Sequence, residues 1–261
     1  MKKLLLTTDD FGMCHAVNEG IVQAMTLGLA TSTNFIAPAP WFSEAVSLAK
    51  EHHLPVGVHF CLGSDWDRFG WGPLTGNPRL MGPDGRLPPS PENLEQMGAT
   101  DEDLYDELVA QVRLVQRVYG EPTHVETHMV GGSWRGGFLN RLQNVFIKVA
   151  RDFNLAYTYE RDPASGRLKH FVDEDCQSGW SRDAFLSKLR SWTAPGSYHL
   201  FGHAAVQSPE LDALCSPDYP ARRWASEYRM KDQALYRDLT LRNDLENLGF
   251  SLVGVKDALN S

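Results

Sequence analysis

Short apolar runs alternate along the chain with longer segments whose apolar residues recur at helical spacing. Residues 101–119 show the helical pattern clearly, with Leu104, Leu108, Val112 and Val115 on one face. Strands are predicted over residues 4–10, 30–37, 55–60, 123–129, 155–159, 197–201 and 250–255. Helices are predicted over residues 17–27, 41–51, 101–119, 138–152, 183–192 and, as one long or two shorter helices, 222–248. About seven such alternations are typical of βαβ units around a mostly parallel sheet.

Open doubly wound sheets and closed (β/α) barrels both produce this alternation. Polar residues at the carboxyl ends of several predicted strands favour a barrel, because barrel active sites lie at that end. Residues 63–100 break the pattern, since they are rich in proline and glycine and contain Trp66, Phe69 and Trp71. A loop of this length is usually a functional lid or binding loop. We therefore expect residues 1–261 to form one α/β domain with a long inserted loop at 63–100.

Composition and charge narrow the class of protein. The net charge of −8 and the pI near 5.6 argue against a nucleic acid or an anionic membrane as partner. No run approaches the ~20 apolar residues of a membrane-spanning helix, and the apolar run after Lys3 is too short for a signal peptide. The four cysteines are widely spaced, which is typical of free thiols in a reducing compartment. We expect a cytoplasmic protein.

Two adjacent carboxylates, Asp9 and Asp10, end the first predicted strand. Neighbouring strand residues point to opposite faces, so the two can share a site only if the backbone turns there, and Phe11-Gly12 is the predicted turn. Two close carboxylates repel each other, which requires a cation or a proton between them. One interpretation is a metal site in which one Asp is a ligand and the other transfers a proton. The alternative is a polar turn that caps the following helix.

Histidines and a further carboxylate occur at three other predicted strand ends. His59 follows an apolar run, His124, Glu126 and His128 share one face of the strand at 123–129, and His203 follows the strand at 197–201. Imidazoles combined with carboxylate suit zinc or another first-row divalent ion. Each residue alone has a plainer interpretation, as a hydrogen-bonded core or turn residue. Burying all of them without partners would be costly, however, so together they favour one metal site.

These residues also occur in an order that resembles a known family. The matching motifs are Thr8-Asp9-Asp10-Phe11-Gly12, Gly57-Val58-His59-Phe60, the loop residues Gly72-Pro73-Leu74 and Asp84-Gly85-Arg86-Leu87, Pro122 to His128, and Gly202-His203. The ordered set resembles the YdjC-like carbohydrate deacetylases, which include the chito-oligosaccharide deacetylases. The resemblance covers most of the chain.

The resemblance implies a deformed (β/α) barrel that removes an N-acetyl group from an amino sugar or oligosaccharide. It implies one divalent metal ion, Mg²⁺ or Zn²⁺, held by Asp10, His59 and His128. Asp9 would be the general base and His203 the general acid. A homodimer is the oligomer that the family suggests. Our candidates for substrate binding are the aromatic residues and the carboxylate near these motifs: Trp66, Phe69, Trp71, Glu126 and Trp134.

Some positions depart from the family pattern. The family usually has Asp where this chain has Glu126, further histidines where it has Met129-Val130, and His-Pro-Gly where it has His203-Ala204-Ala205. The metal set is intact, but the pocket wall is atypical, so the acylated sugar could differ. Two other functions remain open from the sequence: a metal-dependent hydrolase of another amide or of a phosphoester, and a non-catalytic saccharide-binding protein. Trp66, Phe69 and Trp71 also have a plainer interpretation, as residues that pack the loop instead of stacking on a sugar.

Overall fold

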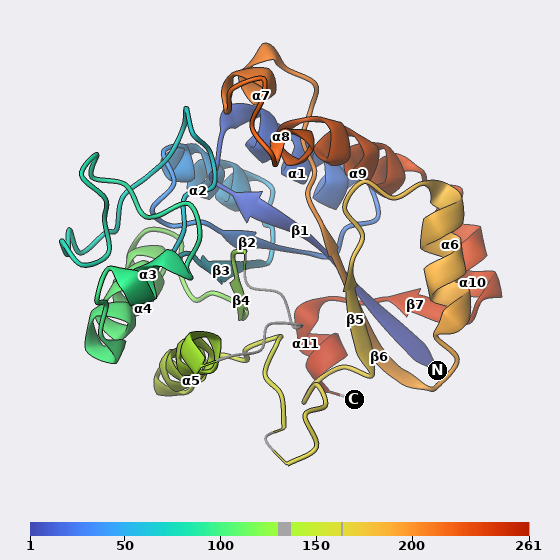
Figure 1. Ribbon diagram of the computed structural model, residues 1–261. Helices are drawn as coiled ribbons and strands as arrows, with labels where there is room; N and C mark the ends of the chain where they lie inside the picture. The colour runs from blue at the N-terminus through green and yellow to red at the C-terminus, as the bar shows by residue number, and fades with distance from the viewer. Residues whose placement is uncertain (130–136, 163, 261) are drawn as a thin grey trace.

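The computed structural model describes residues 1–129, 137–162 and 164–260. Within them, parallel strands form one curled sheet surrounded by helices (Figure 1). The strands are β1 (Lys2–Phe11), β2 (Ser32–Phe35), β3 (Val56–Phe60), β4 (Val125–Thr127), β5 (Asp173–Cys176), β6 (Gly196–Gly202) and β7 (Phe250–Leu252). Their order is β4-β3-β2-β1-β6-β5, with β7 paired to β1. This curled half-barrel confirms the prediction of a deformed α/β barrel.

Strand β1 is the centre of the sheet and pairs in parallel with β2, β6 and β7. Its residues Leu4, Leu5 and Leu6 are fully buried, as expected for a parallel strand covered on both faces. Because Lys2 pairs with Gly196 and with Phe250, the beginning and the end of the chain contribute to the same sheet.

The helices follow the predicted periodicity closely where that periodicity was strong. The longer helices are α1 (His15–Leu27), α2 (Phe42–Glu51), α4 (Asp101–Val118), α5 (Gly137–Asp152), α6 (Arg182–Ser191) and α9 (Glu227–Arg237). The shorter ones are α3 (Asn93–Gln96), α7 (Pro209–Ala213), α8 (Arg222–Ala225), α10 (Leu241–Asn247) and α11 (Val255–Leu259). Thr100 and Asp103 form a capping box at the start of α4, which fixes its first residue. None of the described helices is both long and apolar enough to cross a membrane.

Three segments differ from the prediction. Residues 155–159 do not form a strand, and only Tyr157 makes an isolated bridge, to Val125. Here Tyr157 and Tyr159 are buried and pack edge to face, so the apolar pattern reflects packing between β4 and β5. Strand β5 was not predicted, because its sequence Asp-Glu-Asp-Cys lacks an apolar pattern. The segment 222–248 also divides into three helices, α8, α9 and α10.

The segment 63–100 is largely irregular, as predicted, with α3 as its helix. Helix α4 anchors it through the buried carboxylate of Glu107. This carboxylate accepts hydrogen bonds from the backbone N–H groups of Leu74 and Thr75, at 3.0 and 2.9 Å, and from the Thr75 hydroxyl at 2.8 Å. The long loop is therefore fixed to the barrel by bonds to a charged acceptor.

Candidate metal centre and active site

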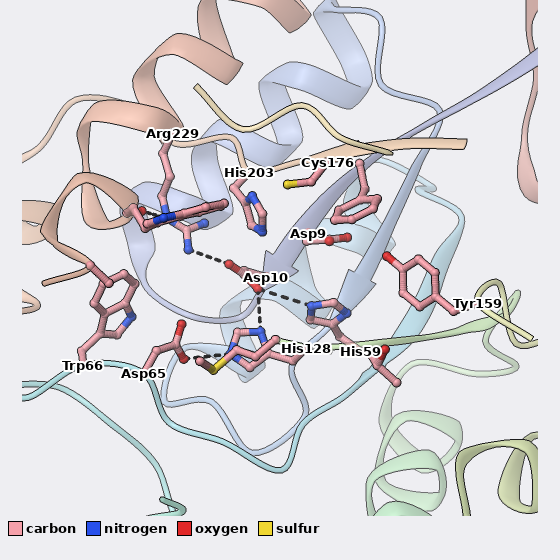
Figure 2. Close-up of a pocket in the computed structure, with 15 residues that line it drawn as sticks. Asp9, Asp10, His59, Asp65, Trp66, His128, Tyr159, Cys176, His203 and Arg229 are labelled. Atoms are coloured by element: carbon pink, nitrogen blue, oxygen red, sulfur yellow. Dashed lines mark hydrogen bonds and ion pairs between the residues drawn. The ribbon is translucent and has the colours of Figure 1, made fainter. Parts of the chain in front are cut away.

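The carboxyl ends of four strands bring the predicted residues together. Asp9 and Asp10 come from the end of β1, His59 from β3, His128 from just after β4, and His203 from just after β6. All five line one cavity of about 350 Å³. Figure 2 shows their side chains pointing toward one another around Asp10.

The backbone turns at Asp10 itself, one residue before the predicted Phe11-Gly12 turn. Asp10 has a φ of +75°, Gly12 follows with +108°, and the register of β1 against β2 shifts between Thr8 and Phe11. Asp is one of the few non-glycine residues that enters this left-handed region routinely. The local twist cancels the usual alternation of strand side chains, so both Asp9 and Asp10 face the cavity.

Asp10, His59 and His128 offer ligand atoms that lie within 4.8 Å of one another. Asp10 Oδ1 is 3.1 Å from His128 Nδ1 and 3.5 Å from His59 Nε2. This oxygen is buried and faces the two ring nitrogens. Two imidazole nitrogens and one carboxylate oxygen, with a cavity on the open side, fit a divalent metal ion that keeps free coordination positions.

Charged neighbours contact the second carboxylate oxygen of Asp10 and the second ring nitrogen of His128. Burial alone would raise the pKa of Asp10, but Arg229, whose Nη2 lies 2.6 Å from Asp10 Oδ2, and hydrogen bonds from the two histidines hold that pKa well below its usual value. Burial would likewise lower the pKa of His128, yet Asp65, whose Oδ1 lies 2.8 Å from His128 Nε2, helps to hold it well above its usual value. A carboxylate on the far nitrogen of a ligating imidazole orients the ring.

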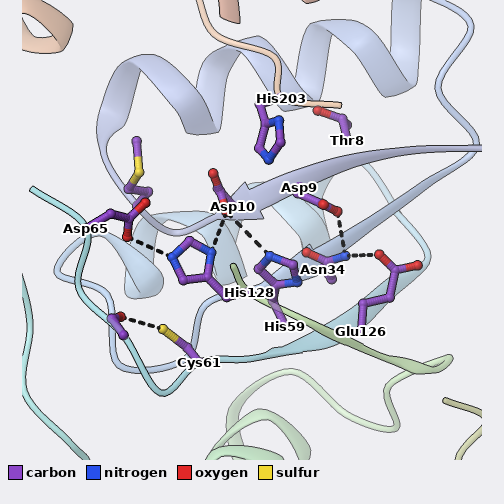
Figure 3. A network of polar contacts seen from close by, with 12 residues as sticks. Thr8, Asp9, Asp10, Asn34, His59, Cys61, Asp65, Glu126, His128 and His203 are labelled. Atoms are coloured by element: carbon purple, nitrogen blue, oxygen red, sulfur yellow. Dashed lines mark hydrogen bonds and ion pairs between the residues drawn. The ribbon is translucent and has the colours of Figure 1, made fainter. Parts of the chain in front are cut away.

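Asp9 has a different environment from its neighbour. Its Oδ1 accepts a hydrogen bond of 2.9 Å from Asn34 Nδ2, which also donates to Glu126 Oε2 at 2.8 Å (Figure 3). Burial raises the pKa of Asp9 to about 8, and Glu126 and Asp10 add to this while His59 opposes it. A cation close by would favour the ionised form. Asp9 and Asp10 thus differ strongly in proton affinity, which suits a proton acceptor beside a ligand.

His203 follows β6, which pairs with β1 at Thr8 and Gly202, so its ring lies beside Asp9 and Asp10, on the side away from His59 and His128 (Figure 2). Burial lowers its pKa to about 3, so the ring is neutral at pH 7 in the metal-free site. Its Nδ1 is hydrogen-bonded to the hydroxyl of Ser178, and its ring packs edge-on against Trp224 with centroids 5.5 Å apart.

The predicted substrate-binding residues are spread over several environments. Trp66 lines the cavity, whereas Phe69, Trp71 and Glu126 are not part of its described lining. Trp71 donates from Nε1 to Cys61 Sγ at 3.2 Å and packs near His128, so it supports a site residue from behind. Glu126 is fully buried beneath Asp9, which places it in contact with Asn34 instead of with the cavity. Trp134 lies outside the described residues.

Among the cavity-lining residues that sequence reasoning missed are Asp65, Arg229, Trp224 and Tyr159. Arg229 and Trp224 come from the α8–α9 region, which the sequence marks only as helical. Arg229 is 2% exposed, and a buried Arg requires an acidic partner, but its periodic position alone does not reveal this burial. Tyr159 was assigned to a strand that does not form.

Known proteins resemble this chain over nearly its whole length. The sequence profile of the YdjC-like protein family matches residues 3–247. The chain belongs to the YdjC-like family. A relative from Geobacillus stearothermophilus, named carbohydrate deacetylase, is 35% identical over 97% of this chain and 96% of its own length. Another relative, the chitooligosaccharide deacetylase of Yersinia pestis (strain Pestoides F), is 27% identical over 96% of this chain and 97% of its own length.

A solved structure shares the fold of this chain at lower identity. The crystal structure of a protein from Enterococcus faecalis V583, described as a candidate cellobiose-phosphate cleavage protein, is 20% identical to this chain. It superposes with a TM-score of 0.77, covering 99% of both chains. At this identity the likeness concerns the fold alone.

Proposed function

We propose that this protein is a metal-dependent carbohydrate deacetylase that removes an N-acetyl group from an amino sugar or oligosaccharide. The observation that supports this most directly is the convergence of Asp10, His59 and His128 on one point beside Asp9. The names of full-length relatives, carbohydrate deacetylase and chitooligosaccharide deacetylase, indicate the class of substrate.

In this proposal Asp10 Oδ1 and one ring nitrogen from each of His59 and His128 hold the divalent ion. Imidazole ligands suit Zn²⁺, and an open site of this kind also accepts Mg²⁺. When bound, the ion supplies Lewis acidity, which polarises an amide carbonyl and acidifies a water molecule. Arg229 keeps Asp10 ionised and oriented through its 2.6 Å contact with Oδ2, so the other oxygen remains available.

Two residues of the chain then move protons. Asp9 is held by Asn34 with its carboxylate toward the cavity, and it accepts a proton from the attacking water. His203, which lies beside Asp9 at the end of the neighbouring strand β6, delivers a proton to the departing amine nitrogen. Together these roles supply a proton acceptor for the water and a proton donor for the leaving amine.

The cavity wall is suited to a neutral sugar. Trp66, Tyr159 and Trp224 contribute aromatic surface to it, and aromatic rings pack against the apolar faces of sugars while their polar edges remain free to hydrogen-bond. A cavity of about 350 Å³ lies at the small end of the usual range for ligand sites. We propose that it accommodates the acetylated residue of the saccharide.

The proposal also includes a single catalytic domain over residues 1–261 in the cytoplasm. Support for one domain comes from the sheet, in which β1 pairs with β2, β6 and β7. The cavity-lining residues are drawn from positions 9 to 229, so the candidate site depends on most of the chain.

A pair of isosteric substitutions at neighbouring positions tests the assignment. Asp10→Asn removes a charged ligand and should abolish stoichiometric metal binding, measured by elemental analysis and calorimetric titration. Asp9→Asn should retain the metal and lower the rate of acetate release from N-acetylated chito-oligosaccharides by about 10²- to 10⁴-fold, the usual contribution of a general base. Asn tolerates the left-handed backbone at position 10, so both variants should fold.

The contrast between the two variants decides the question. Asp9→Asn with unchanged turnover would refute the role of Asp9, and Asp10→Asn with unchanged metal content would refute the metal site. Release of phosphate from phosphorylated sugars without release of acetate would favour a phosphoester hydrolase. Tight saccharide binding without any turnover in Zn²⁺, Mg²⁺, Mn²⁺ or Co²⁺ would favour a non-catalytic binding protein.

A further inference from the structure

Arg229 on helix α9 uses only part of its guanidinium group for contacts within the protein. The side chain reaches from α9 to Asp10 (Figure 2). Its Nη2 donates to Asp10 Oδ2 at 2.6 Å and lies 3.6 Å from Met13 Sδ, and its Nε donates to the backbone carbonyl of Trp224 at 3.0 Å. Because a guanidinium group is planar, these contacts at two of its nitrogens fix the position of the third.

The third nitrogen of Arg229, Nη1, is buried and has no hydrogen-bond partner in the part of the chain that the structure describes. A buried donor without a partner is costly, and more so when it carries charge, so such a donor indicates a bound molecule that supplies the acceptor. Arg229 is 2% exposed and lines the same cavity as Asp9, Asp10 and His203. The missing acceptor therefore belongs to a molecule that occupies this cavity.

Helix α9 is itself bonded to the segments around the cavity. Three residues after Arg229, the side chain of Asp232 is fully buried. Its carboxylate accepts the backbone N–H of Gly179 at 2.6 Å and that of His203 at 2.8 Å. These bonds hold the helix, so the guanidinium group meets an incoming molecule at a fixed place. A donor that is already in place needs no reorganisation when charge develops on its acceptor.

The two oxygens of Asp10 indicate which atom of the substrate Nη1 contacts. Oδ1 faces the ring nitrogens of His59 and His128, whereas Oδ2 is bonded to Arg229. A single carboxylate thus separates the candidate metal position from the guanidinium group, so Arg229 lies beside the reacting end of the cavity. The oxygen of an acetyl group at that end gains negative charge when the acyl carbon is attacked. Positively charged N–H donors stabilise such charge strongly in a site that excludes water.

We propose that Nη1 of Arg229 donates a hydrogen bond to the acyl oxygen of the substrate, so that Arg229 is a catalytic residue as well as the partner of Asp10. This inference rests on the proposed function. When water adds to the acyl carbon, one C–O bond forms and the π electron pair of the carbonyl moves to the acyl oxygen. The pair returns as the C–N bond breaks. Asp9 has taken a proton from the water and the amine nitrogen takes one from His203, and solvent restores both groups.

A sugar hydroxyl is the other acceptor that a saccharide offers to Nη1. A bond to a hydroxyl has the same strength in the bound substrate and in the transition state, so its loss raises KM and leaves kcat unchanged. A bond to the acyl oxygen strengthens as charge develops, so its loss lowers kcat with little change in KM. The two kinetic constants therefore distinguish the two acceptors.

Steady-state kinetics of Arg229→Lys provide the first measurement. Lysine keeps a positive charge beside Asp10 but has a single nitrogen, so the second donor is lost. With the Zn²⁺ content confirmed by elemental analysis, kcat for acetate release from N-acetylated chito-oligosaccharides should fall about 10²- to 10³-fold, the effect of removing one oxyanion donor. KM should change less than about twofold. Arg182→Lys is the matched control, because Arg182 contacts Asp238 and Asp244 and is not part of the described lining of the cavity, and it should change neither constant.

Binding of a transition-state analogue provides a measurement that does not depend on turnover. The probe is the N-methylphosphonamidate of glucosamine, whose tetrahedral phosphorus carries a negatively charged oxygen in place of the acyl oxygen. Calorimetric titration should show about 10²- to 10³-fold weaker binding to zinc-loaded Arg229→Lys than to the zinc-loaded unmodified protein. In the unmodified protein labelled with ¹⁵N-arginine, the complex should show ¹⁵N–³¹P coupling across the hydrogen bond. Among the described residues, Arg229 is the arginine that lines the cavity, so the coupling identifies its guanidinium group.

Each result either supports or overturns the inference. Unchanged kcat and analogue affinity in Arg229→Lys would overturn it, and so would a rise in KM at constant kcat, which would assign Nη1 to a sugar hydroxyl. If Arg229→Lys does not fold or does not retain Zn²⁺, the coupling in the unmodified protein decides, since its presence supports the inference and its absence overturns it. No acetate release by the unmodified protein would refute the proposed function and the inference together. Acetate release with equal kinetics in both proteins would refute the inference alone.

Discussion

The contact between Asp65 and His128 allows a graded test of the metal site. Asp65 belongs to the long loop, and its Oδ1 lies 2.8 Å from Nε2 of His128, while Nδ1 of the same ring faces Asp10. If Nδ1 of His128 binds the metal, Nε2 must carry the ring proton. The Nε2–H group then donates a hydrogen bond to the carboxylate of Asp65. The side chain of Asp65 is only 15% exposed, so solvent weakens this bond little.

The expected magnitude follows from this geometry. A hydrogen bond to a charged group contributes about 1.5–3 kcal/mol, and removal of a carboxylate that orients a ligating histidine lowers metal affinity by roughly 10- to 100-fold. The two ranges agree, since tenfold in affinity is about 1.4 kcal/mol. Asp65→Ala should therefore bind Zn²⁺ about 10- to 100-fold more weakly. The Zn²⁺ affinity of Asp65→Asn should lie between those of Asp65→Ala and the unmodified protein, because an amide oxygen accepts the hydrogen bond but carries no charge.

Calorimetric titration with Zn²⁺ and with Mn²⁺ provides the measurement, in a buffer of constant pH. Asp67 is the matched control, because it lies two residues away in the same loop and accepts the N–H of Ser216 at 2.8 Å. Asp67→Ala should leave the affinity within about twofold, since it does not touch His128. Equal affinities for Asp65→Ala and the unmodified protein would refute the orienting role. An equal loss in the Asp67 variant would assign the effect to the loop as a whole.

Four further predictions concern the wall, the loop and the buried histidines. Trp224→Ala should raise KM for the saccharide by about 5- to 10-fold, the equivalent of roughly 1 kcal/mol of aromatic contact. Glu107→Gln should lower the free energy of unfolding by about 1–3 kcal/mol, because a loop N–H then faces an amide donor. Gly57→Ala should cost about 1–3 kcal/mol, since a Cβ would lie 2.5 Å from the His124 ring. Burial lowers the pKa of His124 and of His199 to about 3, so stability should fall as pH drops from about 6.5 toward 3, on the order of 1 kcal/mol per pH unit for each imidazole.

Urea denaturation at several pH values measures the last three effects, and kinetics measures the first. For both imidazoles the folded pKa lies below the unfolded one, so the unfolded state binds more protons in this window and stability rises with pH. A flat stability between pH 6 and pH 4 would contradict the buried, neutral state of the two rings. Trp224→Phe should retain most of the substrate affinity if ring stacking is the cause.

Much of the fold could be predicted from periodicity, because long amphipathic helices and buried apolar strands carry repeated signals. The helix at 101–118 and the strand before Asp9 are examples. Strand β5 could not be predicted, because its residues Asp173 to Cys176 are polar and half-buried. Their pairing with β6 is decided by tertiary contacts. The prediction of a strand at 155–159 was wrong for the converse reason. Its aromatic residues are buried by packing, and this burial does not require pairing in the sheet.

The residues of the candidate site likewise divide into those that the sequence predicts and those that it does not. Residues at the ends of strands could be predicted to meet, because parallel strands deliver their carboxyl ends to one edge, and Asp10, His59 and His128 do meet there. Asp65 and Arg229 could not be predicted, since a loop and a distant helix bring them to the site. Neither hydrophobic pattern nor spacing records which charged side chain becomes buried against which ligand.

Helix α9 carries Arg229 and Asp232 three residues apart, one bonded to Asp10 and the other to the backbone of His203. Side chains at this spacing lie on one face, so a single helix contacts both the candidate metal ligand Asp10 and the backbone at His203. A small rotation of α9 would disturb both contacts at once. Substitutions on its outer surface, far from any reacting atom, should therefore weaken metal retention and turnover in parallel.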